Sequence, residues 1–167
     1  MISQANSRMK SYTFNSATTA ATRRIGQTIG KELQPGDIIL LAGPLGSGKT
    51  TLVQGIAKGL GVSGNVMSPT FVLMRELAGR IMLYHFDLYR LEKMPEISDL
   101  GLDDYLYGEG ATVIEWADRA ENLWPEDHLR IDLEYAGAKA RKLKITAQGT
   151  RYTRLLSQMV NKMGPSP

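Results

Sequence analysis

The chain has 167 residues, of which 43% are hydrophobic and 22% charged, and its formal net charge is +3. This composition is typical of one soluble folded domain and excludes a disordered chain. No run approaches the ~20 consecutive apolar residues that span a bilayer, and the N-terminus lacks the apolar centre of a signal peptide. We therefore expect a cytoplasmic protein without membrane contact. With no cysteine and two histidines, neither disulfides nor a zinc site is expected.

Charge is distributed unevenly along the chain. Residues 1–31 carry five Lys or Arg and no acid, and residues 136–167 carry seven and no acid, so all acids lie between these ends. Basic ends can contact nucleic acid or an acidic partner, but no aromatic residues are interleaved with them as on a base-stacking surface. Solvated faces of helices and strands are the favoured interpretation.

The first quarter of the chain predicts a helix followed by a strand. Residues 1–11 are polar and aperiodic, which predicts a flexible N-terminus. Apolar residues then recur at every fourth position, which predicts a helix that begins after Ser16 or Thr18 as N-cap and ends near Leu33. The continuous apolar run at 37–42 is typical of a strand buried on both faces of a parallel sheet.

The rest of the chain alternates strands and helices. The predicted segments are a helix after residue 50 that Gly61 ends, an antiparallel strand pair within 71–88 around Ala78-Gly79, a buried strand Ala111–Glu115, half-solvated strands at 129–135 and 142–147, and a helix at 151–162. This order predicts an α/β fold, a three-layer P-loop NTPase-like domain with a mixed parallel/antiparallel central sheet. It forms a single domain over 12–162, and 163–167 is a flexible tail.

A glycine-rich motif follows the first predicted strand. Residues 43–50 read GPLGSGKT and match G-x-x-x-x-G-K-[ST] between a strand and a helix, which is the context that a phosphate-binding loop requires. Main-chain N–H groups surround the phosphate oxygens, so side chains at Gly46 and Gly48 would obstruct them, and the helix N-terminus adds partial positive charge. Lys49 supplies an ammonium group for the outer phosphates, and Thr50 is placed to bind Mg²⁺.

Acids at the ends of neighbouring strands are the next requirement of such a site, because they hold Mg²⁺ and orient the attacking group. Asp87 and Glu115 each stand where a hydrophobic strand meets polar sequence. The alternatives are a turn or cap residue for Asp87 and a helix-start residue for Glu115. The remaining candidates are weaker, and a cap or surface role is favoured for them: Asp103, Asp104 and Asp118.

Four further residues, His85, Ser68, Thr70 and Trp116, are open to two interpretations. His85 is either a general base or a packed, hydrogen-bonded imidazole, and the second reading is favoured on a strand beside aromatic residues. Ser68 and Thr70 flank Pro69, and their hydroxyls either sense the terminal phosphate or metal, as in a switch loop, or only begin a strand. Trp116 either packs in the core or lies beneath the nucleotide.

The type of phosphate chemistry follows from what the sequence lacks. Residues 161–164 read NKMG, without the Asp of a guanine-reading N-K-x-D loop, so ATP is favoured over GTP. The middle of the chain has few arginines, and an arginine that stabilises transition-state charge is worth about 10³–10⁵ in rate. A partner protein is therefore expected to complete the site. A small-molecule kinase and a non-hydrolysing regulatory nucleotide-binding module stay open as alternatives.

Four segments carry a resemblance to a known family: GPLGSGKTTLVQGIAKGLG, VMSPTFVL, YHFDLYRL and ATVIEWADR. In this order and spacing, from about Thr13 to Gly149, the chain resembles the TsaE (YjeE) family. The resemblance implies a small P-loop ATPase of tRNA threonylcarbamoyladenosine biosynthesis. It also implies binding to the partner proteins TsaD and TsaB, whose threonylcarbamoyl transfer to adenosine 37 of tRNA is supported by ATP hydrolysis, so that tRNA is met only indirectly.

The resemblance also implies roles for single residues. It places catalytic roles on Lys49, Asp87 and Glu115 and magnesium ligation on Thr50, Asp87 and Glu115. It places ATP contacts on Thr19, Leu45, Gly46, Ser47, Gly48, Lys49, Thr50, Thr51 and Arg141. The family's hydroxyl-bearing segment near the nucleotide base matches around Thr18, Thr19 and Thr22. Arg141 stands in the last predicted strand pair, where it reaches the nucleotide or the partner, and Ala138 stands where a second basic residue is expected.

Overall fold

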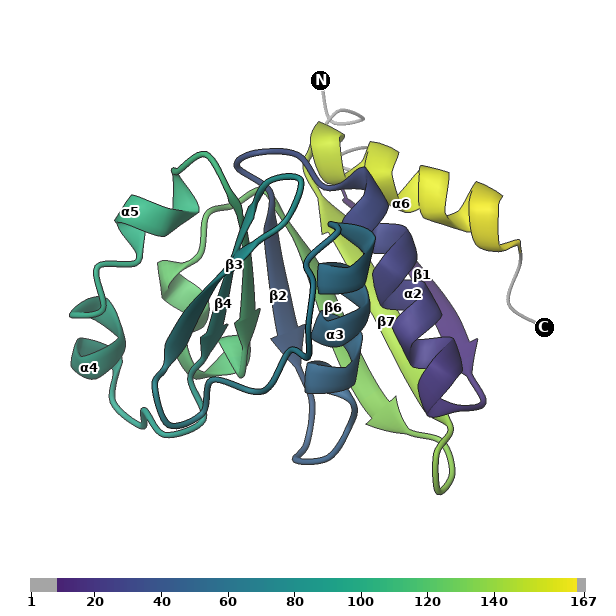
Figure 1. Ribbon diagram of the computed structural model, residues 1–167, viewed down its shortest axis with the longest axis horizontal. Helices are drawn as coiled ribbons and strands as arrows, with labels where there is room; N and C mark the ends of the chain where they lie inside the picture. The colour runs from purple at the N-terminus through teal and green to yellow at the C-terminus, as the bar shows by residue number, and fades with distance from the viewer. Residues whose placement is uncertain (1–8, 165–167) are drawn as a thin grey trace.

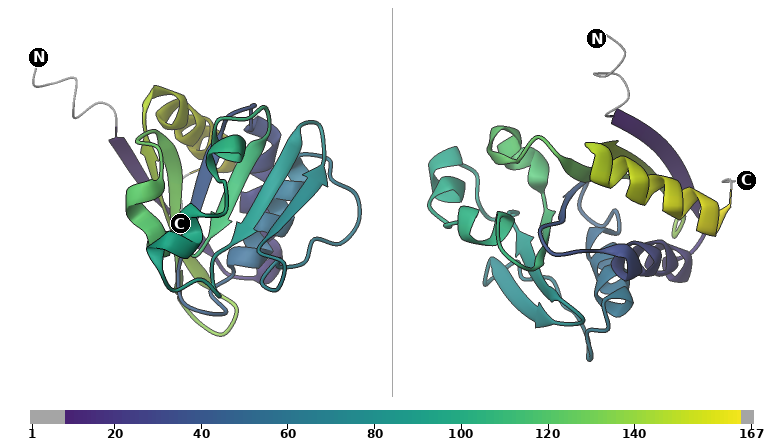
Figure 2. Two further views of the ribbon diagram at one scale, coloured as in Figure 1. Left: turned by 90° about the vertical axis from the view of Figure 1, so that its left-hand side faces the viewer. Right: turned by 90° about the horizontal axis from the view of Figure 1, so that it is seen from above.

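The computed structural model describes residues 9–164, which form one seven-stranded sheet with helices on both sides (Figures 1 and 2). The strands, in chain order, are β1 (Met9–Ser16), β2 (Ile38–Ala42), β3 (Met74–Ala78), β4 (Met82–Asp87), β5 (Ala111–Glu115), β6 (His128–Tyr135) and β7 (Arg141–Gln148). The helices are α2 (Thr19–Glu32), α3 (Lys49–Gly59), α4 (Met94–Ser98), α5 (Asp103–Leu106), the 3-10 helix η1 (Ala117–Leu123) and α6 (Thr150–Met163). No described helix is both long and apolar enough to cross a membrane.

The sheet is parallel at its centre and antiparallel at both sides. Its strand order is β1-β7-β6-β2-β5-β4-β3, in which β6, β2, β5 and β4 are parallel, whereas β7 pairs antiparallel with β6 and β1, and β3 with β4. Parallel neighbours bring their carboxyl ends to one edge, so Asp87 at the end of β4 pairs in register with Glu115 at the end of β5. This pairing brings both predicted acids to the end of the sheet where β2 leads into the glycine-rich loop.

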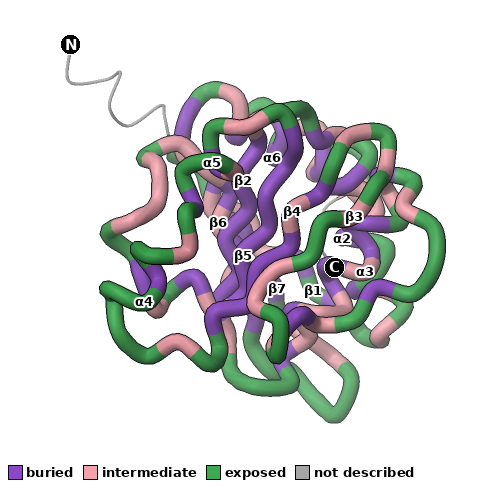
Figure 3. The backbone as a smooth tube through the Cα atoms, turned by 60° about the vertical axis from the view of Figure 1, so that its left-hand side comes forward, coloured by how far each residue is buried: buried purple, intermediate pink, exposed green. Residues whose placement is uncertain are grey.

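Strand β2 has a hydrophobic core on each side. Ile39 and Leu41 face the larger core, which the apolar stripes of α2, α3 and α6 complete, and Ile38 and Leu40 face a smaller core beneath α4, α5 and η1. Because both faces of β2 are covered, all five of its residues are buried, as the continuous apolar run predicts. Figure 3 shows buried residues running along the central strands and exposed residues along the loops and outer helices.

Helices α2 and α3 pack with their backbones in contact. Gly26 and Gly30 of α2 face Gly55 and Gly59 of α3, and a Cβ atom at any of the four would lie only 2.1–2.3 Å from a carbonyl oxygen of the other helix. A glycine inside a helix costs about 0.5–1 kcal/mol relative to alanine. The close approach requires these glycines and fixes the N-terminal end of α2 beside the glycine-rich loop.

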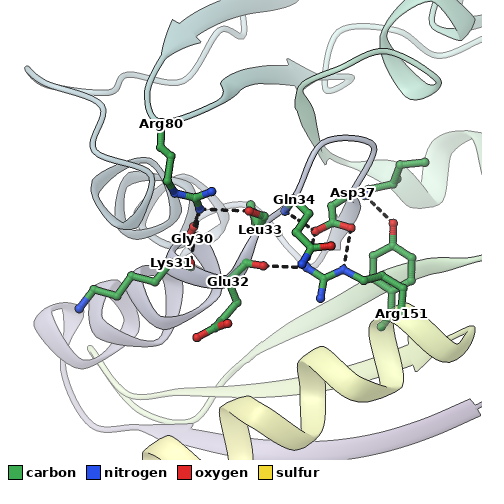
Figure 4. A network of polar contacts seen from close by, with 10 residues as sticks. Gly30, Lys31, Glu32, Leu33, Gln34, Asp37, Arg80 and Arg151 are labelled. Atoms are coloured by element: carbon green, nitrogen blue, oxygen red, sulfur yellow. Dashed lines mark hydrogen bonds and ion pairs between the residues drawn. The ribbon is translucent and has the colours of Figure 1, made fainter.

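Helix α6 is tied to the start of β2 by a partly buried polar network (Figure 4). The Arg151 guanidinium donates to both carboxylate oxygens of Asp37, at 3.1 and 2.7 Å, and also to the Glu32 carbonyl at 2.7 Å. The backbone N–H of Ile38 donates to the Tyr152 hydroxyl at 2.8 Å. The C-terminal helix therefore belongs to the core of the fold.

The predicted fold class is confirmed, and most predicted elements are present. Thr18 is the N-cap of α2, since its hydroxyl accepts from the Ala21 N–H at 3.0 Å. The strand Ala111–Glu115 has the predicted bounds. Both predicted strand pairs are antiparallel.

Other boundaries were predicted wrongly. Residues 9–11 belong to β1 rather than to a flexible terminus, and β1 escaped prediction because only Tyr12 and Phe14 face the core. Residues 71–73 form a turn, in which Leu73 has a left-handed φ of 69°, and β3 begins only at Met74. Met163 is the last residue of α6, not part of a tail. The rest of the predicted flexible ends, 1–8 and 165–167, lies outside the described residues, and α4, α5 and η1 were not predicted.

Candidate functional site

A cavity of about 360 Å³ lies at the carboxyl ends of β2, β4 and β5, where the glycine-rich loop passes into α3. It is lined by Leu45, Gly46, Gly48, Lys49, Thr50, Thr51, Ser68, Thr70, Asp87, Tyr89, Glu115 and Trp116. In open α/β sheets, ligands bind outside the carboxyl ends of the strands. We call this space the main cavity.

The glycine-rich loop has the backbone of an anion cradle. Gly46 and Gly48 have left-handed φ angles of 77° and 103°, which side chains rarely adopt. Gly48 is also the N-cap of α3, and no side chain caps this helix. The first N–H groups of α3 therefore stay available to an anionic ligand, to which the helix end adds partial positive charge.

Lys49 is buried against its own loop. Its Nζ donates to the carbonyls of Gly43 at 2.7 Å and Pro44 at 3.0 Å, and it lies 4.0 Å from the centre of the Trp116 ring. Burial lowers the pKa of Lys49 below its ordinary value, while nearby carboxylates, Glu115 first among them, act in the opposite direction. The ammonium group is thus held at the cavity wall by neutral carbonyls and an aromatic face.

Thr50 and Glu115 meet across the main cavity. The Thr50 hydroxyl donates to Oε1 of Glu115 at 3.0 Å, and only 2% of Glu115 is exposed. Glu115 is therefore not a helix-start residue. It ends β5 as a buried carboxylate that faces the start of α3.

Asp87 is held by hydroxyl groups. Its Oδ2 accepts from Ser68 Oγ at 2.6 Å and from Thr70 Oγ1 at 2.8 Å, while its Oδ1 accepts from the Tyr89 N–H at 2.9 Å. Ser68 and Thr70 lie in the loop before β3, so they do not begin a strand. Their hydroxyls face the acid at the wall of the main cavity, which is compatible with a switch-loop role.

His85 occupies the packed, hydrogen-bonded position rather than that of a general base at the cavity wall. It is fully buried, lines no part of the main cavity, and has its Nε2 at 2.6 Å from Oε2 of Glu115. Trp116 does line the main cavity, in a left-handed conformation with φ 61°. Trp124 lies in the smaller core, where its indole N–H donates to the Ala117 carbonyl at 2.8 Å.

A hydroxyl and two carboxylates, those of Thr50, Asp87 and Glu115, face one space beside the phosphate-binding backbone. Within residues 9–164, no group of three or more His, Asp or Glu side chains could hold a metal ion unaided. Mg²⁺ is bound typically through one or two carboxylates, with water and substrate phosphates completing its octahedron. The donor set therefore fits a magnesium ion that enters with a phosphate ligand.

A second, smaller cavity of about 60 Å³ adjoins the first on the side of α2. It shares three residues with the main cavity, Gly46, Gly48 and Thr51, and its other lining residues are Thr19, Thr22, Lys139 and Arg141. Arg141 donates to the Ser47 carbonyl at 3.0 Å and to the Gly46 carbonyl at 3.1 Å, so it also braces the loop from behind.

The structure thus distributes the predicted site residues over both cavities. Thr19 and Arg141 line the smaller cavity. Ser47 lines neither cavity, because this residue of the loop is fully buried. Two lining residues were missed. Lys139 follows the Ala138 position where a second basic residue was expected, and Tyr89 follows the predicted acid by two residues. Of the weaker acids, Asp103 and Asp104 line a separate pocket beside α5, and Asp118 is exposed at the start of η1.

A buried parallel strand, a glycine-rich loop and the helix that follows it, with acids ending the two neighbouring strands, define a P-loop α/β protein. Comparisons with known proteins narrow this class. The family model described as "Threonylcarbamoyl adenosine biosynthesis protein TsaE" matches residues 16–143. The chain belongs to the TsaE family.

Individual relatives agree with this assignment. The chain is 39% identical over 152 residues to the tRNA threonylcarbamoyladenosine biosynthesis protein TsaE of Bacillus subtilis, covering 90% of this chain and 95% of the relative. It is 42% identical over 135 residues to the protein of the same name from Nostoc, covering 78% and 82%. The crystal structure of Bacillus subtilis YdiB superposes with a TM-score of 0.82 at 33% identity, covering 93% of this chain and 98% of that one.

Proposed function

We propose that this chain is the Mg²⁺-dependent ATPase of the tRNA threonylcarbamoyladenosine machinery. One observation carries the proposal: the Thr50 hydroxyl and the carboxylates of Asp87 and Glu115 converge on the cavity that the phosphate-binding loop opens into. A site for phosphate alone needs no such acids. A site for a phosphate together with its magnesium ion does need them.

The roles of the residues follow from their positions. Lys49 and the main chain of the loop, including Leu45 and Thr51, bind the phosphates of ATP, while Thr50, Asp87 and Glu115 would hold Mg²⁺. When bound, the ion neutralises charge on the terminal phosphates. Asp87 and Glu115 additionally orient the attacking water. Thr19 and Arg141, in the smaller cavity, lie where they can reach the rest of the nucleotide.

Slow hydrolysis by the chain alone is part of the proposal. In the described part of the chain, no arginine lines the main cavity. Arg90 and Arg119 lie nearby but contact aromatic rings, at 5.6 Å from Phe71 and 5.3 Å from Trp116 respectively. Because a charge-stabilising arginine is worth about 10³–10⁵ in rate, we propose that the TsaD and TsaB proteins complete the site and that ATP turnover supports their reaction on tRNA.

The test is ATP hydrolysis by the wild type and by Glu115→Ala, each with and without TsaD and TsaB. We expect the partners to raise the wild-type rate and the Glu115→Ala rate to stay near the background. Glu109→Ala, which removes an exposed acid just before β5, is the matched control and should behave as the wild type.

Two other results would contradict the proposal. An ATP hydrolysis rate that TsaD and TsaB leave unchanged, but that a small metabolite raises, would indicate a small-molecule kinase. ATP binding without hydrolysis, even with both partners present, would indicate a regulatory nucleotide-binding module.

A further inference from the structure

His85 lies directly behind Glu115, outside both cavities. It pairs in register with Val113 on the neighbouring strand, so it lies on the same face of the sheet as Glu115, which follows Val113 by two residues. None of its surface is exposed, and its Nε2 lies 2.6 Å from Oε2 of Glu115. The imidazole therefore contacts Glu115 from outside the main cavity, whereas Glu115 itself lines that cavity.

The hydrogen-bond directions follow from the chemistry of the groups. A carboxylate only accepts, so a hydrogen bond between the two groups requires the proton on Nε2 of His85. The Thr50 hydroxyl donates to the other oxygen of the same carboxylate at 3.0 Å. Glu115 is thus held from β4 on one side and from α3 on the other. Because the Thr50 proton points at Glu115, the lone pairs of the Thr50 oxygen stay available to a metal ion.

The other ring nitrogen of His85, Nδ1, does not contribute a hydrogen bond to the described part of the fold. Nδ1 is buried and has no hydrogen-bond partner among the described residues. By contrast, the second histidine, His128, lies 2.8 Å from the Pro125 carbonyl through its Nδ1, an ordinary local contact at a strand start. A buried polar atom without a partner costs free energy, and such atoms often accompany catalytic sites. Among the residues that the structure describes, Glu115 is the one polar partner of the His85 side chain.

We infer that His85 is a positioning residue for the magnesium site: its Nε2–H fixes the orientation of the Glu115 carboxylate and, through it, that of the Thr50 hydroxyl. This inference rests on the proposed function. Outer partners that orient metal ligands are typically worth about 10–100-fold in metal affinity or activity. Replacing the donor should weaken the response to magnesium without weakening the contacts between the loop and the phosphates.

The experiment compares three variants that differ in the donor. In His85→Gln the side-chain amide nitrogen can reach the place of Nε2, in His85→Asn it is one methylene too short, and His85→Leu fills a similar volume without a donor. ATP affinity is measured from intrinsic tryptophan fluorescence, to which Trp116 at the cavity wall contributes, first in excess EDTA and then over a magnesium titration. His128→Gln is the matched control, and thermal unfolding monitors the fold of each variant.

We expect all folded variants to bind ATP in EDTA as the wild type does. In His85→Asn and His85→Leu, half-saturation should need about 10–100-fold more magnesium. His85→Gln should recover most of this loss, and His128→Gln should show none. An unchanged magnesium requirement in a folded Asn or Leu variant refutes the positioning role alone. A wild type whose ATP affinity does not respond to magnesium refutes the proposed function and the positioning role together.

A measurement on the unaltered protein covers the case in which the variants do not fold. Nitrogen-15 NMR of the wild type distinguishes the two ring nitrogens of His85. A protonated Nε2 with slow hydrogen exchange and an unprotonated Nδ1 supports the role. The reverse tautomer overturns it, because Nε2 then cannot donate to Glu115.

Discussion

Asp37 and Glu115 are both buried carboxylates, but they lie at opposite ends of neighbouring strands and have different partners. Asp37 precedes β2 and accepts hydrogen bonds from Nε and Nη2 of Arg151. Glu115 ends β5, and within residues 9–164 its carboxylate accepts from a hydroxyl and an imidazole N–H and from no cationic group of Lys or Arg. In the described part of the chain, neither Glu115 nor its neighbour Asp87 forms an ion pair with a lysine or an arginine.

The difference in partners indicates different roles: Asp37 is a structural acid, whereas Glu115 and Asp87 are candidates for binding a cation. A buried carboxylate stays ionised at low cost only if a positive charge compensates it. At the α6 end that charge is permanently supplied by Arg151, as Figure 4 shows. At the loop end two acids share a cavity in which Lys49 is the nearby cation and is itself held by carbonyls. We propose that a metal ion arriving with the ligand supplies the remaining charge.

The largest expected effect is on stability, at the Asp37 end. Arg151→Ala leaves the Asp37 carboxylate buried without its cation, and breaking a buried pair in this way costs about 3–5 kcal/mol. Denaturant unfolding measures this loss. Arg154→Ala, an exposed arginine one turn later on α6, should change stability by less than about 0.5 kcal/mol. An equal loss in both variants would mean that α6 is held by packing rather than by the ion pair.

The second largest expected effect is on activity, at the end of the sheet that carries the glycine-rich loop. Asp87→Asn keeps the shape of the side chain, and the hydroxyls of Ser68 and Thr70 can accept from an amide as well as donate to a carboxylate. The free energy of unfolding should therefore change by less than about 1 kcal/mol. Partner-stimulated, magnesium-dependent hydrolysis should fall by about 100-fold. Asp104→Asn is the exposed control. A large loss of stability in Asp87→Asn would place Asp87 in the same class as Asp37.

The smallest effect concerns pH and returns to the α6 end. Burial raises the pKa of Tyr152 to about 12, from 10.0 in the unfolded chain. Between these values the folded protein holds a proton that the unfolded chain has lost, so the stabilisation is full below pH 10 and decreases as the pH rises. The loss approaches about 2–3 kcal/mol near pH 12.

Unfolding of Tyr152→Phe at several pH values checks this expectation. The variant should be less stable at neutral pH, because the Ile38 N–H loses its acceptor, but its stability should fall less between pH 10 and 12. Tyr107→Phe, which alters a tyrosine that is 73% exposed, should retain the wild-type slope. Parallel pH curves for wild type and Tyr152→Phe would contradict the prediction.

Much of the candidate site could be predicted from the sequence alone because the patterns that indicate it are local in the chain. The loop motif adjoins its strand and helix, and Asp87 and Glu115 each end an apolar run. Parallel pairing then brings those ends together without further information. The ATP and magnesium contacts of these residues stay predictions.

The contacts that escaped prediction join distant parts of the chain. Asp37 and Arg151 are separated by 114 positions, and His85 and Glu115 by 30, so no local pattern links them. Strand β1 gains its order from pairing with β7 rather than from its own composition. The short helices α4 and α5 have too few residues for a helical period to be recognised.

The close approach of α2 and α3 at their four glycines leads to an expectation about which part of the molecule moves. Because the two helices approach to backbone contact, we expect them to move as one rigid body that holds Thr19 on α2 beside the loop that begins α3. Under the proposed function, a nucleotide that spans both would meet a preformed surface, and little entropy would be lost in ordering that surface. We expect a conformational response to come from the segment 66–73, whose hydroxyls reach Asp87 from a loop containing a left-handed leucine.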